Sequence, residues 1–496
     1  MEFPVEPPLW LMTPTEKARW DHANKVLAHA QARNLSQISR TSRNSGAAPA
    51  DTDKSSFEEV SSRTGPCAMN PAIVSVEAIE ILDSRGNPTL RVWVRLTNGI
   101  EACADVPSGA STGQFEAHEM RDKNDGRYDG LGVRRAIANI LGVIRPALLG
   151  HDPTMQPEID RLMIELDGTA QKSSLGANAI LGVSMAVARA AAQALGIPLY
   201  RYLGGTDARR LPVPMMNIIN GGKHASNGLE FQEFMIVPHG APNFAEALRY
   251  GVETYHSLKA ILRQQGLSTA VGDEGGFAPQ LAGNEKACEL IVAAIEKAGF
   301  TPGRQIALAL DPAATSFYHD GVYAIPSWND KPKTSADLLG VYEEWTKRFP
   351  IVSIEDGLAE TDWHGFAEMT ARLGNSLQIV GDDNYVTNTK FIRRGVAEKT
   401  TNAALIKVNQ IGTVTEAIEA IDLCREAGWR FVISHRSGET SDAFIADFAV
   451  AMGGGQIKSG APARGERVAK YNRLLEIEHE LGSLAVFSDP FAGAMV

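Results

Sequence analysis

The sequence predicts an α/β fold: a (β/α)8-type barrel preceded by a smaller α+β domain. From residue 206 onward, short apolar runs rich in β-branched residues alternate with amphipathic helical segments that carry capping residues. Each run ends at a polar residue, and the runs are 306–310, 351–354, 377–381, 403–406, 431–434 and 456–457. Buried parallel strands joined by crossover helices are typical of a barrel. A doubly wound open sheet is the competing fold, but its site would gather at a switch point rather than at every strand end.

Residues 71–205 predict the smaller α+β domain, because strand patterns come first and helical patterns follow. The strand patterns span 73–82, 90–96 and 100–106, and the helical patterns span 134–148, 155–166 and 177–195. The most apolar stretch, 177–197, contains Asn178, Arg189 and Gln193. It therefore predicts a buried helix rather than a membrane span.

Residues 1–70 have a different composition from the rest of the chain. Residues 36–70 are rich in Ser, Thr, Ala and charged residues and have few large apolar ones, so we predict a disordered extension. A short helix is expected only over residues 13–34. Met69 stands just before the first strand pattern and is an alternative start of the biological chain.

Charge and cysteine content narrow the classes of partner and compartment. The formal net charge of −11 argues against a nucleic-acid-binding or anionic-membrane-binding surface, which needs a basic field. The four cysteines are far apart and form no CxxC, which favours reduced thiols in a cytoplasm. The N-terminus shows no secretory pattern. We expect a cytoplasmic protein, and the sequence leaves open a secondary cell-surface or secreted pool.

Three carboxylates are predicted at consecutive strand ends: Asp311, Glu355 and Asp382. The carboxyl ends of barrel strands surround one site, so these side chains would converge. Like charges brought together need a compensating cation. Oxygen ligands without cysteine or paired histidine favour a hard divalent ion, most simply Mg²⁺. Taken singly, each carboxylate is more simply explained as a helix cap or an ion-pair partner.

Two lysines, Lys407 and Lys458, end the later strands on the same rim, with Arg436 between them in sequence. A lysine beside other cations has a lowered pKa, which a general base needs near neutral pH. The structural alternative is that both lysines pair with the carboxylates. Arg436 and Ser437 lie on a glycine-containing turn that suits a phosphate group, although a surface turn explains the same residues.

Three glycine-rich loops, 107–113, 221–225 and 271–276, complete the pattern. None follows a Walker or dinucleotide-binding motif. Each carries polar side chains on a flexible backbone, as a closing loop over a site requires.

Six segments together resemble the enolase family, in order and over about residues 71–485. They read DSRGNPT at 83–89, SGASTG at 108–113, GDEGG at 272–276, KVNQIG at 407–412, SHRSGET at 434–440 and IKSGAP at 457–462. The resemblance implies the enolase fold and a lyase that reversibly dehydrates 2-phospho-D-glycerate to phosphoenolpyruvate in glycolysis and gluconeogenesis. It also implies a homodimer or larger homo-oligomer.

The resemblance further implies a role for each site residue. Lys407 would remove the C2 proton, and Glu274 would be the acid that helps the C3 hydroxyl leave. Two Mg²⁺ ions are implied: Asp311, Glu355 and Asp382 would hold the first, and Ser111 would cap the second, which arrives with substrate. Arg436 and Ser437 would hold the phosphate. The remaining pocket residues would be His224, Gln232, Glu233 and Lys458.

The departures from the family pattern are few. Pro312 follows Asp311 where a small β-branched residue is usual, and Asn384 is less typical after Asp382 and Asp383. Neither replaces a functional side chain. A sugar-acid dehydratase of the same superfamily is one alternative, but it would not be expected to keep the Arg436–Ser437 turn or the Glu274 loop. A non-catalytic scaffolding role, for example in RNA processing, is the other.

Overall fold

A computed structural model describes residues 71–110, 113–328 and 331–492. The predictions made for residues 1–70, including the helix at 13–34 and the role of Met69, lie outside the described residues. The same is true of Ser111.

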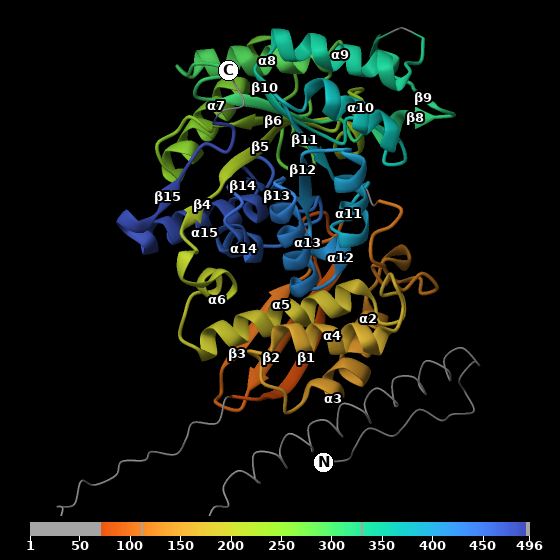
Figure 1. The fold of residues 1–496 in the computed structure, drawn as a ribbon, viewed down its shortest axis with the longest axis vertical. Helices are drawn as coiled ribbons and strands as arrows, with labels where there is room; N and C mark the ends of the chain where they lie inside the picture. Colours follow the sequence, from red (N-terminus) through yellow and green to blue (C-terminus); the bar gives the residue numbers. More distant parts are fainter. Residues whose placement is uncertain (1–70, 111–112, 329–330, 493–496) are drawn as a thin grey trace, which may run out of the picture.

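The smaller domain is a three-stranded antiparallel sheet covered by helices. The strands β1 (Ile73–Leu82), β2 (Pro88–Leu96) and β3 (Glu101–Asp105) lie in the order β1-β2-β3. The helices α4 (Gln156–Asp167) and α5 (Ala177–Ala194) follow. Helix α5 packs on β2 and β3 and also contacts the barrel helices α12 and α13, so it lies between the sheet and the barrel (Figure 1). This explains why an alanine-rich helix is buried on nearly every side.

The helix predicted over 134–148 is interrupted. It forms α2 (Arg134–Asn139), a π-helical turn over Ile140–Ile144, and α3 (Arg145–Leu148). Pro146 stands at the start of α3, where it has no N–H to donate to the preceding turn. A π-helical turn accommodates such a local break without ending the helical path.

The larger domain is a closed eight-stranded barrel, which confirms the predicted fold class and excludes the open sheet. Its strand order is β10-β11-β12-β13-β14-β5-β6-β7. The strands are β5 (Val213–Asn220), β6 (Glu233–Val237), β7 (Ala307–Asp311), β10 (Ile351–Glu355), β11 (Gln378–Gly381), β12 (Ala403–Ile406), β13 (Arg430–Ser434) and β14 (Gln456–Lys458).

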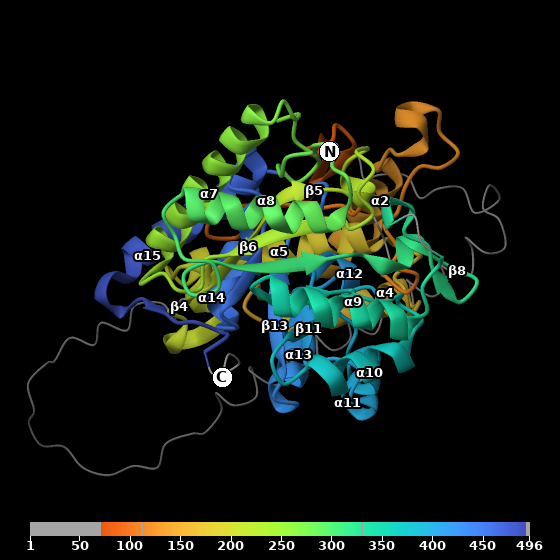
Figure 2. The same cartoon turned by 90° about the horizontal axis from the view of Figure 1, so that it is seen from above.

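Helices surround these strands on the outside (Figures 1 and 2). They are α7 (Phe244–Gln264), α8 (Asn284–Lys297), α9 (Ser335–Arg348), α10 (Trp363–Leu373), α11 (Thr389–Glu398), α12 (Val408–Ile411), α13 (Val414–Glu426), α14 (Phe444–Met452) and α15 (Gly465–Leu481). Helix α9 begins with a capping box between Thr334 and Asp337. Gly428, just past α13, has a φ of 69° that favours glycine.

One strand departs from the regular alternation of parallel strands and helices. β6 pairs antiparallel with both β5 and β7, so β5 and β6 form a hairpin through residues 221–232. Glu233 begins β6 and pairs with Asp311, which ends β7. The start of β6 therefore lies at the same rim as the ends of the parallel strands.

Apolar side chains fill the barrel interior below that rim. Val213, Met235, Ala309 and Leu405 belong to this inner cluster, and Phe491 near the C-terminus packs into it. Over the described residues, no single helix has the length and apolarity needed to cross a membrane. The segments 177–194 and 199–207 reach that length and apolarity only when taken together, and they are bent by 98° relative to each other.

Candidate active site

The polar strand ends meet in one buried pocket. Its lining residues are His224, Gln232, Glu233, Glu274, Asp311, Lys407, Ser434, His435, Arg436, Ser437 and Lys458. The carboxylates of Glu355 and Asp382 are also buried and contact the two lysines. The structure thus brings together every described side chain that the sequence placed in the site. Three sides of the pocket have distinct chemistry, and a fourth is formed by the Arg436–Ser437 turn, called the phosphate turn below because the sequence predicts that it holds a phosphate.

The first side is a lysine surrounded by carboxylates. Lys458 Nζ lies 3.0 Å from Glu233, 2.9 Å from Asp311 and 3.0 Å from Glu355. Burial and the charge of Asp311 raise the pKa of Glu355 well above its usual range. Since so many buried carboxylates exceed the charge of one ammonium, this side favours an additional cation.

The second side is Lys407, which stands directly after β12. Its Nζ contacts Asp382, whose other carboxylate oxygen accepts a hydrogen bond of 2.8 Å from Gln410. The backbone N–H of Lys407 donates to Thr387 Oγ1 at 2.9 Å, which fixes the start of the side chain.

The expectation of a lowered lysine pKa is wrong for the ligand-free protein. Burial disfavours the charged ammonium of Lys407, but Asp382 outweighs burial and raises its pKa. Likewise, Asp311, Glu233 and Glu355 overcome burial and raise the pKa of Lys458 well above its usual range. The nearest neighbours of each lysine are carboxylates rather than cations, and the sequence alone did not show this.

The third side carries an acid pair flanked by imidazoles. Oxygen and nitrogen atoms of Glu274, Glu233 and His224 lie within 4.8 Å of one another. Glu274 accepts a hydrogen bond of 3.2 Å from Asn217 and lies 3.3 Å from His435 Nε2. Asn217 is on β5 and Glu233 on β6, so the hairpin supplies much of this side.

Protonation within this pair is unequal. Burial and the negative charge of Glu274 raise the pKa of Glu233 well above its usual range. Burial also favours the protonated form of Glu274, but His435 and His224 outweigh it and lower the pKa of Glu274. The two carboxyl groups therefore differ: their surroundings favour the protonated form of Glu233 and the charged form of Glu274. Burial lowers the pKa of His435 to about 4, although the charge of Glu274 acts in the opposite direction.

The phosphate turn is held by contacts between the two domains. Ser108 and Gly438 exchange two backbone hydrogen bonds of 2.8 Å. A Cβ at Gly438 would lie 2.3 Å from Asp83 Oδ2 and 2.8 Å from the backbone oxygen of Ser108, which favours glycine there. Arg467, fully buried on α15, donates hydrogen bonds to the backbone oxygens of Arg436 and Ser437. These contacts aim the Arg436 guanidinium and the Ser437 hydroxyl at the pocket.

Sequence reasoning missed three side chains that shape this site. Asp356 accepts hydrogen bonds of 2.9 Å and 3.0 Å from the backbone N–H groups of Asp382 and Asp383. Arg467 supports the phosphate turn, and Glu116 pairs with Arg436 at 2.9 Å. Neither Arg467 nor Glu116 belongs to a sequence motif from which its place in the site could have been predicted. The φ of 42° at Asp356 marks a strained position only once the structure is known.

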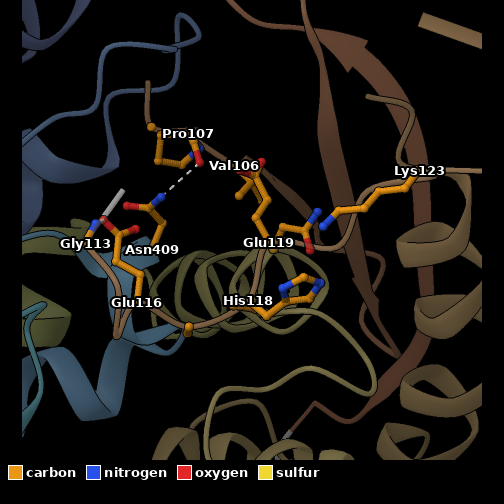
Figure 3. Close-up of a pocket in the computed structure, with 12 residues that line it drawn as sticks. Val106, Pro107, Gly113, Glu116, His118, Glu119, Lys123 and Asn409 are labelled. Carbon is orange, nitrogen blue, oxygen red and sulfur yellow. Dashed lines mark hydrogen bonds between the residues drawn. The ribbon is translucent and has the colours of Figure 1, made fainter. Parts of the chain in front are cut away.

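A second cavity, of about 260 Å³, is lined by residues of the smaller domain and by Asn409 of the barrel (Figure 3). Glu116 lines this cavity while its carboxylate contacts Arg436 of the pocket. His118, Lys123 and Asn409 are among its other lining residues.

The pocket has the groups needed to bind a small, highly anionic ligand together with divalent cations. Among the described residues, the buried Gln232 Oε1 has no hydrogen-bond partner, which leaves an acceptor ready for a ligand. As oxygen donors, Asp311, Glu355 and Asp382 suit Mg²⁺ in chemistry and charge. Among the described residues, the groups of three whose ligand atoms lie within 4.8 Å of one another are instead His224–Glu233–Glu274 and Asp356–Asp382–Asp383. With Lys407, Glu274 and the Arg436–Ser437 turn beside them, such carboxylates would suit proton abstraction next to a carboxylate, followed by loss of a leaving group.

Comparison with known proteins agrees with this chemistry. Residues 73–203 match the family model for the enolase N-terminal domain, and residues 208–494 match that for the enolase C-terminal TIM barrel domain. The chain is 62% identical over 419 residues to "Enolase 1" of Methylococcus capsulatus, covering 84% of this chain and 100% of that protein. It is 60% identical to an enolase of Desulfotalea psychrophila, over 84% of this chain and 100% of that protein. It is 59% identical to an enolase of Acidothermus cellulolyticus, over 84% of this chain and 96% of that protein. The chain therefore belongs to the enolase family.

Proposed function

We propose that this enolase reversibly dehydrates 2-phospho-D-glycerate to phosphoenolpyruvate and water, using two Mg²⁺ ions per active site. The observation that supports the proposal is one pocket lined by Lys407, Glu274, Arg436, Ser437 and Asp311, with Glu355 and Asp382 ion-paired to its two lysines. Asp311, Glu355 and Asp382 would hold the first ion. Ser111, outside the described residues, would cap the second ion when substrate arrives. Bound Mg²⁺ would stabilise the negative charge that builds up on the substrate carboxylate as the C2 proton leaves.

Each side of the pocket then has a task. Lys407 Nζ takes the C2 proton, and Glu274 returns a proton to the C3 hydroxyl, which leaves as water. Lys407 must lose its own proton first. Asp382 raises its pKa in the ligand-free protein, so a cation on Asp382 would remove the partner that keeps Lys407 charged. Donation by Glu274 requires its carboxyl group to be protonated, and Glu233, within the same cluster, is the neighbouring carboxyl group whose surroundings favour a proton.

The remaining pocket residues bind and orient the substrate. Arg436 and Ser437 hold the phosphate, and Lys458 adds positive charge beside the substrate carboxylate. His224, Gln232 and Glu233 line the side where the leaving hydroxyl lies. We also propose a cytoplasmic homodimer or larger homo-oligomer that does not bind nucleic acid or membranes directly. The net charge of −11 supports the last point.

The direct test is the appearance of phosphoenolpyruvate, followed by its ultraviolet absorbance, from 2-phospho-D-glycerate in the presence of Mg²⁺. Turnover with Mg²⁺ and none in chelator supports the proposal. A sugar-acid dehydratase would instead act on an unphosphorylated sugar acid, and a scaffolding protein would act on neither. Absence of turnover by well-folded protein would exclude the proposed activity.

Asp356 provides a prediction for metal binding. Its carboxylate fixes the backbone of Asp382, and its own carbonyl accepts a hydrogen bond of 3.0 Å from Ala314, near the end of β7. It therefore ties together the strand ends that carry Asp311, Glu355 and Asp382. Loss of an outer-shell partner of this kind weakens metal affinity by about tenfold to a hundredfold. We expect Asp356→Ala to raise the Mg²⁺ dissociation constant, measured by calorimetry, by that factor.

The controls for this prediction separate positioning from general damage. Asp356→Asn keeps one acceptor oxygen and should lie between wild type and Asp356→Ala. Asp337→Asn removes an exposed carboxylate at the start of α9 and should leave Mg²⁺ affinity unchanged. Wild-type affinity in Asp356→Ala would show that Asp356 does not position the ligands.

A further inference from the structure

The guanidinium that would bind the substrate phosphate already holds a carboxylate. Arg436 Nη1 lies 2.9 Å from Glu116 Oε2, and Nη2 lies 3.1 Å from Glu116 Oε1, which is a two-point contact. The side chains of Arg436 and Glu116 are only 3% and 9% exposed. Charge-assisted, two-point pairs of this kind are strong and directional. Glu116 thus occupies the face of Arg436 that a phosphate would take.

The two anions cannot share this face at low cost. A phosphoryl group carries about −2 charge at neutral pH and seeks the same N–H fork. In a buried site the repulsion between that group and Glu116 is poorly screened. An incoming phosphate must therefore displace Glu116, and only an anion stronger than a carboxylate can do so. A singly charged carboxylate ligand gains little by the exchange.

The structure offers a place for the displaced side chain. Glu116 also lines the second cavity, of about 260 Å³, and Figure 3 shows it at one side, beside Asn409, with Lys123 and His118 at the other. Two further contacts hold Glu116 in its present position. The backbone N–H of Gly113 donates a hydrogen bond of 3.0 Å to Glu116 Oε1, and Gln410 Nε2 donates a longer one of 3.5 Å to the same oxygen. A side-chain rotation would carry the carboxylate into this cavity, whose lining includes Lys123 as well as Glu119, a carboxylate already paired with Arg121.

We propose that Glu116 is a specificity-determining residue of the phosphate subsite, which holds Arg436 until a dianionic phosphoryl group displaces it into the second cavity. The inference rests on the proposed function, because it takes Arg436 as the phosphate ligand. Its consequence is that unphosphorylated acids are rejected: they cannot outcompete the internal carboxylate. The protein binds phosphorylated ligands less tightly than Arg436 alone would allow, and it discriminates better.

The test compares full-length wild type, Glu116→Gln and Glu360→Gln by calorimetry with two probes, inorganic phosphate and D-glycerate, at fixed Mg²⁺. Glu116→Gln keeps the shape but removes the competing charge. We expect phosphate to bind about tenfold tighter or more, and D-glycerate affinity to rise by a larger factor, so that the preference for phosphate narrows. Glu360 is a nearby half-buried carboxylate on the barrel side, for which no contact with Arg436 is seen. Its substitution should change either affinity by less than about twofold.

A second variant keeps the test decisive if Glu116→Gln folds poorly. Glu116→Asp retains the charge but is too short for the two-point contact, so phosphate should bind moderately tighter than in wild type. Unchanged or weaker phosphate binding in both Glu116 variants would overturn the inference. A different outcome would count against the proposed activity alone. In it, wild type fails to turn over 2-phospho-D-glycerate, while the phosphate affinities of wild type and the Glu116 variants still differ as expected. The role of Glu116 would then stand.

Discussion

Lys407→Ala should abolish both the exchange of the C2 hydrogen of 2-phospho-D-glycerate with solvent and the formation of phosphoenolpyruvate. No other described group stands in the position of Lys407 Nζ, beside Asp382 at the end of β12. Glu274→Gln should lose product formation by about 10² to 10⁴, the usual range for a positioned acid, because an amide cannot protonate the leaving hydroxyl. The same variant should still exchange the C2 hydrogen, since its base is intact.

The measurement is the loss of the C2 proton signal by NMR in D₂O, with product formation followed in parallel. Lys347→Ala, which removes an exposed lysine of α9, is the matched control and should behave as wild type. Exchange that persists in Lys407→Ala and disappears in Glu274→Gln would reverse the assignment of base and acid.

Removal of divalent metal should produce the other large effect. Excess chelator should abolish turnover, and added Mg²⁺ should restore it, because the substrate carboxylate resists further negative charge without a cation. Asp382→Asn replaces an anionic ligand with a neutral one, so half-maximal activation should need at least about tenfold more Mg²⁺.

Two measurements check this prediction: Mg²⁺ activation curves and direct Mg²⁺ binding by calorimetry. Asp422→Asn, on the exposed face of α13, is the control and should leave both unchanged. Full turnover in chelator would exclude the metal-dependent reaction.

Much of the fold was predictable because buried parallel strands leave a strong signal. The runs before Asp311, Glu355, Asp382 and Lys407 became β7, β10, β11 and β12, each with a shift of at most one residue in its limits. Side chains at strand ends of a closed barrel must converge, so the pocket followed from the pattern. The antiparallel direction of β6 was not predictable in this way, because a short apolar run has the same sequence pattern in a parallel and in an antiparallel strand.

The parts of the site that sequence reasoning missed depend on contacts across long separations. Arg436 and Glu116 are 320 residues apart, and their pairing follows from how the smaller domain sits on the barrel. The same holds for the lysine pKa values. Their direction depends on whether an ammonium faces carboxylates or other cations, and a spacing of strand ends cannot tell these cases apart. Asn384, noted as atypical, is buried and lines no part of the pocket.

The reversed strand also bears on how the molecule folds. Parallel neighbours in the barrel are joined through intervening helices, whereas β5 and β6 pair across one connection at 221–232. Local pairings lose less chain entropy on closing and generally form sooner than distant ones. That hairpin carries Asn217, His224 and Glu233, so we expect these three residues of the acid side to come together early, before Glu274 and His435 join them. We expect the sides that carry Lys407 and Arg436 to form later, when the barrel closes and the smaller domain docks on it.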